Sequence, residues 1–432
     1  MEINAKRLVE NIKTLGRIGY EPEEGTTRPA YSKAYFEGEA YVADLMEAAG
    51  LSVRKDTVGN LIGTWKSTNP DSKILSLGSH IDTVPNGGIY DGTLGVLAAV
   101  ECVRTLREQG YRPKHTIQII AFEDEEGNVV GGTFGSKAFT GNKIDDAMLL
   151  GMQKQGITME DVRNAAQNKD DYLCYLELHI EQGGLLEAEQ KDIGVASGIV
   201  AILRYKVRVA GKANHAGSTP MRLRDDALEK ACLSITDLLE RVRRESDTMV
   251  GTVGTMEIHP GAVNVIPGEV DFIVELRDMD RRTMYGLVDR WAAAWKDRGL
   301  TISPYIDQEE TRCDLRLLEI VRGAADSLGL KRMEMHSGAG HDLINMGKFT
   351  PSALIFIPSR DGISHSIDEY SSPKAIADGA RQKNCSYLIH EFDDKMQAAE
   401  YLNKNLKAGD VVYLKASNAI GLKEITKYLM EQ

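Results

Sequence analysis

The residues best suited to chemistry in this chain are histidines and carboxylates that follow strand-like apolar runs. His80 directly follows ILSLGS, His179 directly follows YLCYLEL, and His365 lies seven residues after the end of SALIFIP. The acidic run EDEE, at 123–126, follows TIQIIAF without a gap. Imidazole nitrogen and carboxylate oxygen are ligands that Zn²⁺ and related divalent ions take in proteins. These residue types therefore suit a metal site.

The elements that must position these residues alternate between strand and helix. Strand-like runs occur at 74–79, 116–122, 172–178 and 352–358, and helical patterns at 33–49 and 93–109. This alternation predicts a mainly parallel sheet covered by helices on both faces, in which ligands bind outside the carboxyl ends of the strands. Asp82 and Asp91, shortly after His80, add two carboxylates to the same edge. A single histidine, or the EDEE run alone, is explained more simply as a group of solvent-exposed surface residues. The placement of all of them at one edge of the sheet favours one metal-binding crevice.

From about residue 200 the pattern changes to that of a small two-layer module. The expected elements are a strand at 204–211, a helix at 225–245, strands at 251–258 and 268–277, a helix at 281–298 and a strand at 300–306. The order β-α-β-β-α-β is typical of a ferredoxin-like α+β module. We therefore predict a metal-binding α/β domain of residues 1–200 and 316–382, interrupted by an inserted domain of residues 201–315.

Composition narrows the partners and the compartment. The 432-residue chain has 52 Lys and Arg against 64 Asp and Glu, a net charge of −12, without a basic block. Nucleic acid and anionic membranes are therefore poor partners. Five dispersed cysteines without a CxxC pair indicate reduced thiols, and we find neither a secretory signal nor an apolar run of the roughly 18–20 residues that a membrane span needs. We expect a cytoplasmic protein.

Eight sequence motifs then point to a family. They are GSHIDTVPNGGIYDGTLGVLAAVE (78–101), FEDEEG (122–127), ELHIEQGGLLE (177–187), GKANHAGSTPM (211–221), PGAVNVIPG (260–268), ELRD (275–278), SGAGHD (337–342) and GISHS (362–366). In this order, through residues 1–382, the chain resembles the M20-type dinuclear metallo-amidohydrolases, in the branch of N-carbamoyl-L-amino-acid hydrolase, allantoate amidohydrolase and β-ureidopropionase. The resemblance implies a zinc-peptidase-like α/β fold whose inserted module acts as lid and dimerisation domain.

The resemblance also implies roles around two divalent metal ions per subunit. The terminal ligands would be His80, Glu126, His179 and His365. Asp91 would bridge the two ions, Glu125 would be the general base for a metal-activated water, and Asp82 would orient an imidazole ligand. Zinc is the expected metal, with manganese, cobalt and nickel as alternatives.

Substrate contacts are implied in the same way. His215 would donate to the developing oxyanion, and Arg277 would hold the substrate carboxylate with its guanidinium fork. Asn264, His341 and Gln182 would contribute further substrate contacts. Without the motifs, His215 is simply a turn histidine and Arg277 a strand-end arginine. Because the inserted module carries His215, Asn264 and Arg277, we expect domain closure and, as in the family, a homodimer that shares residues across its interface.

The expected activity is hydrolysis of the C–N bond of a linear amide or ureido compound. N-carbamoyl amino acids, allantoate, ureidoglycolate and N-carbamoyl-β-alanine all remain open as substrates. A non-catalytic binding or scaffold protein on the same fold, and a peptidase of the same superfamily, are the alternatives. One departure affects the substrate: after EEG the branch continues with an Arg-Phe-containing segment, whereas this chain reads NVVGGTFGSKAFTG.

The last segment, 383–432, has a different character. It resembles the carboxyl-terminal end of Mur ligases, most closely the enzyme that adds D-Ala-D-Ala to the muramyl tripeptide. The phosphate-binding motif GxxxxGK[ST] is absent, so ligase activity is not expected. We interpret the segment as a fusion, with a divergent native helix as the alternative.

Overall fold

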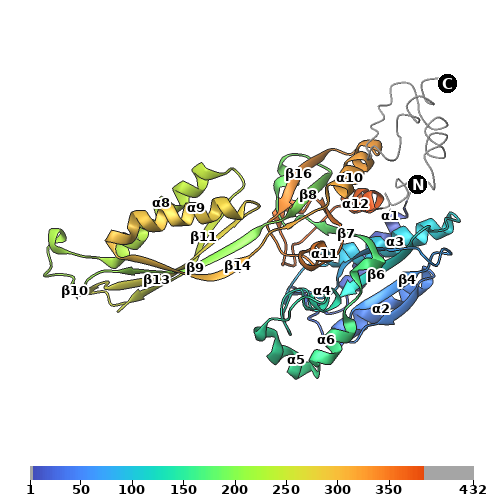
Figure 1. Cartoon of the computed structure of the whole chain (residues 1–432), viewed down its shortest axis with the longest axis horizontal. Helices are drawn as coiled ribbons and strands as arrows, with labels where there is room; N and C mark the ends of the chain where they lie inside the picture. Colours follow the sequence, from blue (N-terminus) through green and yellow to red (C-terminus); the bar gives the residue numbers. More distant parts are fainter. Residues whose placement is uncertain (1–2, 384–432) are drawn as a thin grey trace, which may run out of the picture. The chain divides into compact units, whose positions relative to one another are not determined.

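The computed structural model describes residues 3–383, and its largest feature is a mixed β-sheet (Figure 1). Within these residues the sheet has nine strands, in the order β15-β8-β17-β7-β5-β6-β4-β3, with β16 also paired to β8. The strands are β3 (Ser52–Lys55), β4 (Leu61–Trp65), β5 (Ile74–His80), β6 (Thr116–Phe122), β7 (Tyr172–Ile180), β8 (Ile193–Ile199), β15 (Thr311–Arg312), β16 (Arg332–Ser337) and β17 (Ser352–Ile357). The central strands β17, β7, β5 and β6 run parallel, and on one side β3 and β4 pair antiparallel with their neighbours. On the other side β8 pairs antiparallel with β17 and β15 but parallel with β16.

Helices cover both faces of this sheet. They are α1 (Ala5–Gly16), α2 (Lys33–Ala48), α3 (Thr93–Glu108), α4 (Phe134–Phe139), α10 (Leu315–Ser327), α11 (Leu343–Phe349) and α12 (Pro373–Lys383). Leu178 on β7 faces Gly379 of α12, whereas Tyr175 on the same strand packs against Phe122, which contacts Phe139 of α4. Side chains alternate between faces along a strand, so α12 and α4 cover opposite faces. Burial on both faces explains why the central strands are almost continuously apolar.

The middle of the chain builds a second, smaller sheet with its own core. Its strands are β9 (Ala201–Ala210), β11 (Val250–His259), β13 (Glu269–Asp278) and β14 (Leu300–Gln308), in the order β11-β13-β9-β14. Helices α8 (Ala227–Glu245) and α9 (Arg281–Trp295) lie side by side on one face of it (Figure 1). Trp291 of α9 is fully buried there, and β13 alternates between buried and half-buried residues because only one face is covered. A two-stranded ribbon of β10 (Asn214–His215) and β12 (Val265–Ile266) belongs to the same region.

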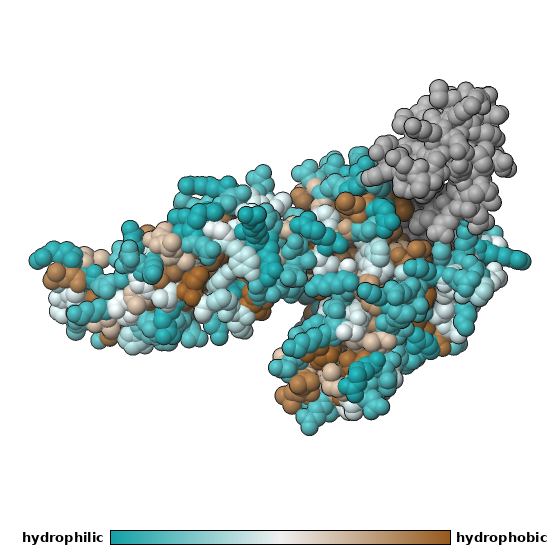
Figure 2. All heavy atoms as spheres, in the orientation of Figure 1, coloured by the Kyte–Doolittle hydropathy of each residue, from teal (hydrophilic) through white to brown (hydrophobic). Residues whose placement is uncertain are grey.

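The surface is mostly hydrophilic in the view of Figure 2, with apolar patches over the four-stranded sheet and around α5 (Leu149–Gln155). Leu149, Leu150 and Met159 are the exposed apolar residues of α5 and α6 (Met159–Ala165). The shorter elements are β1 (Tyr20–Glu21), β2 (Gly25–Thr26) and α7 (Leu185–Ala188). No helix within residues 3–383 combines the length and apolar character that crossing a membrane requires.

The predicted fold class is confirmed: a mixed sheet with a parallel centre lies between helices, beside a β-α-β-β-α-β module. Five strands of the larger sheet were not predicted, namely β3, β4, β8, β15 and β16, and β5 and β7 extend far enough to include His80 and His179. The elements of the smaller sheet run from Ala201 to Gln308; the division into an inserted domain of residues 201–315 stays a prediction. The Mur-ligase-like segment lies outside the described residues, apart from Lys383 at the end of α12.

Candidate metal centre

The carboxyl ends of the central strands bring the predicted ligands together. His80 is the last residue of β5 and is paired in register with Phe122, the last residue of β6, so the acidic run 123–126 begins beside it. His179 lies near the end of β7, opposite Phe356 of β17. The parallel centre of the sheet therefore gathers residues that are far apart in the sequence at one edge.

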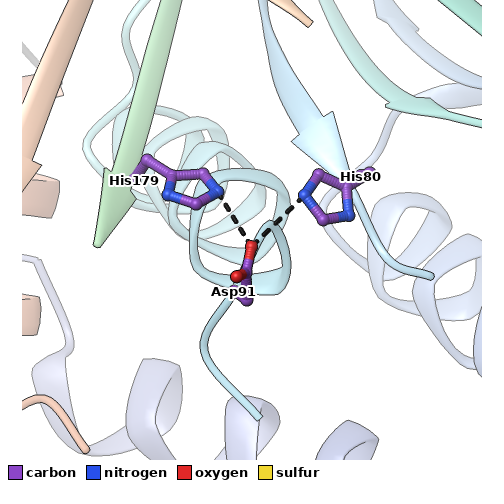
Figure 3. A group of neighbouring side chains, drawn as sticks. All are labelled: His80, Asp91 and His179. Carbon is purple, nitrogen blue, oxygen red and sulfur yellow. Dashed lines mark ion pairs between the residues drawn. The ribbon is translucent and has the colours of Figure 1, made fainter. Parts of the chain in front are cut away.

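Asp91 lies between two imidazoles, as Figure 3 shows. Its Oδ1 atom is 3.1 Å from His179 Nε2 and 3.4 Å from His80 Nε2. All three side chains are buried. Asp91 reaches this position because it directly precedes Gly92, whose left-handed backbone (φ +59°) leads into α3; a Cβ at Gly92 would collide with the His80 ring.

The other ring nitrogens fix the orientation of these histidines. His80 Nδ1 lies 3.1 Å from the backbone carbonyl of Asp82, and His179 Nδ1 lies 2.9 Å from that of Ile180. A carbonyl only accepts, so Nδ1 carries the proton in each ring and donates. In the neutral ring this leaves the Nε2 lone pair facing Asp91, which is the arrangement that a metal-binding imidazole needs.

A second group of possible metal ligands also includes Asp91. His365 Nε2 lies 3.2 Å from Asp91 Oδ2 and 3.7 Å from Glu126 Oε1. Asp91 thus presents Oδ1 to one pair of ligands and Oδ2 to the other side. The hydrogen bond from His365 to Asp91 raises the pKa of His365 to about 9. Unlike His80 and His179, His365 is half exposed.

The charges of this cluster fit a cation. Burial and the nearby Asp91 raise the pKa of Glu126 to about 7, and its Oε1 atom is buried without a hydrogen-bond partner. A buried carboxylate oxygen without a hydrogen-bond partner destabilises the fold unless a positive charge compensates it. The donor set of imidazole nitrogens and carboxylate oxygens suits zinc and the neighbouring divalent metals.

The acidic turn gives each of its members a different environment. Asp124 adopts a left-handed conformation (φ +53°), and its carboxylate accepts hydrogen bonds from the backbone N–H groups of Val130 and Gly131, at 2.6 and 3.0 Å. The turn interrupts strand alternation and lets Glu125 and Glu126 both face the centre. Glu125 Oε2 lies 3.6 Å from His80 Nε2, and burial raises the pKa of Glu125 well above its usual range.

Asp82 connects this turn to β5. Its carboxylate accepts hydrogen bonds from the N–H groups of Glu125 (3.3 Å) and Glu126 (3.0 Å), and Oδ1 lies 3.4 Å from His80 Nδ1. Asp82 therefore contacts a predicted ligand and the turn that carries the predicted base, the arrangement of a residue that would orient them.

The centre opens into a cleft with a volume of about 780 Å³, within the range of small-molecule sites. The cleft is lined by the centre itself (His80, Asp91, Glu125, Glu126, His179, Gln182 and His365) and by side chains that include Lys137, Asn142, Lys143, Arg281, Asp307, Glu309 and Lys348. The second set comes from outside the metal motifs and was not predicted.

The predicted substrate residues lie in different places. Gln182 lines the cleft, but its Nε2 donates to Asp91 Oδ2 at 2.7 Å and so contacts a ligand. His341 is buried behind the centre, with its ring 4.4 Å from that of His179 and its Nε2 2.9 Å from Ser337 Oγ. Burial and His179 lower the pKa of His341 well below its usual range, so the ring is neutral. His341 is not among the residues that line the cleft.

His215, Asn264 and Arg277 do not line the cleft either. His215 and Asn264 are exposed at the β10–β12 ribbon, where the Ala216 N–H donates to the Asn264 carbonyl. His215 Nδ1 accepts from the N–H groups of Gly217 and Ser218, so the proton of the neutral ring is on Nε2, which remains a donor. Arg277 donates through Nε to Glu275 and through Nη1 to the Gly338 carbonyl, at 2.8 and 2.6 Å.

Two residues beside the centre, Ser364 and Glu369, are absent from the predicted set. The Ser364 hydroxyl lies 3.2 Å from Asp91 Oδ2, and Glu369 accepts from the backbone N–H of Asp91. In the sequence these two residues stand out only because they are close to His365. That closeness does not reveal that they contact a loop near residue 90.

Comparison with known proteins gives the family of the chain. The chain is 36% identical over 397 residues to the N-carbamoyl-L-amino acid amidohydrolase of Geobacillus stearothermophilus, covering 88% of this chain and 96% of that protein. It is 35% identical over 406 residues to the ureidoglycolate hydrolase of Arabidopsis thaliana, covering 88% and 85%. The crystal structure of a putative amidohydrolase/peptidase from Burkholderia cenocepacia superimposes with a TM-score of 0.82 at 30% identity, covering 89% and 98%. The model of peptidase family M20/M25/M40 matches residues 76–382, more than half of the chain, which therefore belongs to that family.

Proposed function

We propose that the protein is a metal-dependent hydrolase that cleaves the C–N bond of a linear ureido or carbamoyl compound. One observation carries the proposal: Asp91 faces His80 and His179 with one oxygen and His365 with the other, in a cleft that also contains Glu125. Relatives named as amidohydrolases and ureidoglycolate hydrolases support the choice of bond. These residues would hold a divalent ion, whose chemistry would be to polarise the attacked carbonyl and to lower the pKa of a water.

Two ions per subunit match the two donor groups that share Asp91. His80, Asp91 and His179 would hold one ion, and Asp91, Glu126 and His365 the other. Zinc is the first choice, and manganese, cobalt and nickel suit the same ligands. Within the described residues, His259, Glu269 and Asp271 form another group that could hold a metal ion. Its two carboxylates already pair with the Arg208 guanidinium, so we do not propose an ion there.

Glu125 is the proposed general base. Burial raises its pKa, which suits a carboxylate that takes a proton from water and passes it to the leaving nitrogen near neutral pH. Asp82 holds the backbone of Glu125 and so restricts where its carboxylate can lie.

His215 and Asn264 at the β10–β12 ribbon and Arg277 on β13 of the smaller sheet are the proposed substrate contacts. His215 presents an Nε2–H donor, the group that an oxyanion needs. Because these residues are not among those that line the cleft of their own chain, they would act after closure or from the second subunit of a homodimer. The edge strand β11, with Val250, Met256 and Ile258 exposed, is a suitable dimer surface. Light scattering on the purified chain tests the dimer.

Gln182 and His341 are proposed to act indirectly. Gln182 donates to Asp91, and His341 packs against the ring of His179. Both arrangements constrain the ligands, and Gln182 additionally faces the cleft, where its amide can meet a substrate.

Ammonia release distinguishes the candidate functions. Hydrolysis of a carbamoyl group consumes water and yields ammonia, carbon dioxide and an amine, whereas cleavage of a dipeptide yields two amino acids and no ammonia. The test is a panel of N-carbamoyl-L-amino acids, N-carbamoyl-β-alanine, allantoate, ureidoglycolate and a dipeptide. Each is assayed on metal-free protein reconstituted with Zn²⁺, Mn²⁺, Co²⁺ or Ni²⁺, with Glu125→Gln as the matched inactive control.

Ammonia release that requires metal and Glu125 supports the proposal. Cleavage of the dipeptide alone would identify a peptidase, and metal binding without turnover of any compound would identify a binding protein on this fold. Either result contradicts the proposed activity. The cytoplasmic location stays a prediction from the sequence.

A further inference from the structure

Glu369 contacts two of the loops that carry the predicted ligands of one side of the centre, those of Asp91 and His365. Its side chain is buried, with 5% of the residue exposed. Oε1 accepts hydrogen bonds from the backbone N–H groups of Tyr90 (2.9 Å) and Asp91 (3.1 Å), and Oε2 accepts one from the Ser364 hydroxyl (2.9 Å). One carboxylate thus joins the loop of Asp91 to the loop of His365, which directly follows Ser364.

The loop of His365 needs such an anchor. His365 has a left-handed backbone (φ +55°), which is unfavourable for a residue with a side chain, and its imidazole is half exposed. His80 and His179, by contrast, are buried at the ends of central strands. The position of His365 therefore depends on the contacts of its loop rather than on the sheet.

Neighbouring residues restrict the position of the Glu369 carboxylate. The rings of Tyr90 and Tyr370 pack edge to face, 6.1 Å apart, beside it. A Cβ at Gly88 would lie 2.2 Å from Glu369 Oε1, so any larger residue at position 88 displaces the carboxylate. The Ser364 hydroxyl lies 2.9 Å from Glu369 Oε2 and 3.2 Å from Asp91 Oδ2, between the two acids, and its single proton is donated to one of them at a time.

We propose that Glu369 is a positioning residue that fixes Asp91 relative to His365 and thereby forms the ion position of Asp91, Glu126 and His365. This inference rests on the proposed function, because it concerns the second ion of that centre. The position of His80, Asp91 and His179 depends mainly on β5 and β7 and should depend less on Glu369.

Two substitutions of Glu369 remove different parts of its hydrogen bonding. Glu369→Ala removes every acceptor, whereas Glu369→Gln keeps one oxygen for the N–H groups of Tyr90 and Asp91 and presents an NH₂ group to Ser364. Gly88→Ala perturbs the same contact with Glu369 intact. Asp314→Ala is the matched control: Asp314 also accepts two backbone hydrogen bonds, from Arg316 and Leu317, but at the start of α10 and outside the cleft lining.

The experiment titrates the metal-free full-length chain with Co²⁺, followed by calorimetry and by the visible absorption of the bound ion. Thermal unfolding of each variant is recorded in parallel. In Glu369→Ala we expect the second ion to bind about 10- to 100-fold more weakly, the range found for residues that orient metal ligands, and the first ion to change by less. Glu369→Gln should recover part of the loss, and Gly88→Ala should weaken the second ion like Glu369→Ala. Asp314→Ala should lower the unfolding temperature without changing either affinity.

Unchanged binding of the second ion in both Glu369→Ala and Gly88→Ala would overturn the inference, and so would equal weakening of both ions. If Glu369→Ala does not fold, Gly88→Ala and Glu369→Gln decide by the same criterion. A wild-type chain that binds no second ion contradicts both proposals. A wild-type chain that binds two ions but releases no ammonia from any substrate contradicts the proposed function alone.

Discussion

The Asp82 carboxylate accepts a hydrogen bond from the backbone N–H of Glu126 at 3.0 Å. The same carboxylate lies 3.4 Å from His80 Nδ1, so one side chain connects the end of β5 with the turn after β6. A ligand on one strand and the acidic turn of the next are thereby held in a fixed relation. Asp82 accepts from the N–H of Glu125 as well, so it fixes the backbone of the turn from which both glutamates face the centre.

Glu125→Gln should lower kcat by at least about 10²-fold, because removal of a general base typically costs 10²–10⁴-fold. Metal content and thermal stability should stay near those of the wild type, since the residue moves a proton and does not hold the ion. Elemental analysis and ammonia release measure the two effects. Glu126→Gln is the control and should lose metal; loss of metal in Glu125→Gln instead would show that the two roles are exchanged.

Asp91→Ala and His365→Ala should differ in how much metal they lose. Two ions about 3.5–4 Å apart repel each other unless a carboxylate is shared between them. Asp91→Ala should therefore lower occupancy at both positions, whereas His365→Ala should mainly empty one. Metal-to-protein ratios after dialysis give the answer. Loss of one equivalent in both variants would contradict the bridging role of Asp91.

The sequence predicted the ligand edge of the sheet because strand patterns and chemistry coincide there. His80 and His179 end apolar runs that are buried on both faces, and a parallel sheet must place such ends together. Strand β8, IGVASGI, was missed because its small and polar residues give no clear period, although its pairing with β17 buries it.

Contacts between loops were the part that the sequence does not reveal. The bonds from Glu369 to the N–H groups of Tyr90 and Asp91 join residues almost 280 positions apart, and no local pattern encodes them. For His341 and Arg277 the motif predicted substrate contacts, which stay predictions; the motif did not reveal that His341 packs on His179 or that Arg277 donates to the Gly338 carbonyl. A motif identifies a residue type, but rotamer and packing decide what it touches.

The Glu275 carboxylate should give the protein a stability that depends on pH. Burial raises the pKa of Glu275, but hydrogen bonds from Arg277 and Arg204 lower it more, so its pKa lies below the ordinary value of 4.5. A lowered pKa in the folded state stabilises the fold above the unfolded value, and this contribution is lost as the pH falls through the folded value. Glu275→Gln should therefore cost about 1 kcal/mol at pH 7, a figure reduced by partial exposure.

The difference between wild type and Glu275→Gln should be constant above about pH 5 and shrink below pH 4.5. Urea unfolding at a series of pH values measures it. A difference that grows on acidification would mean that the carboxylate is not held by its two arginines.

Arg277 has two possible roles, and substrate analogues distinguish them. If Arg277 binds the substrate carboxylate, Arg277→Lys keeps the charge but loses the planar fork. A charge-assisted hydrogen bond is worth roughly 1.5–3 kcal/mol, so kcat/KM for an N-carbamoyl amino acid should fall by about 10- to 150-fold. Arg277→Ala should lose more. The analogue with a carboxamide in place of the carboxylate should be hydrolysed almost equally by wild type and variant.

Arg204→Lys is the matched control for this comparison, because Arg204 also donates to Glu275 but lies on β9 and has no proposed substrate contact. Its effect should be the same for the acid and the amide. Equal losses on both analogues for Arg277→Lys would leave Arg277 with its observed contacts, the bonds to Glu275 and to the Gly338 carbonyl. The second of these distinguishes it from Arg204. That bond joins β13 to the SGAGHD loop, so Arg277 would then set the closure of the smaller sheet, and the carboxylate would be selected elsewhere in the cleft.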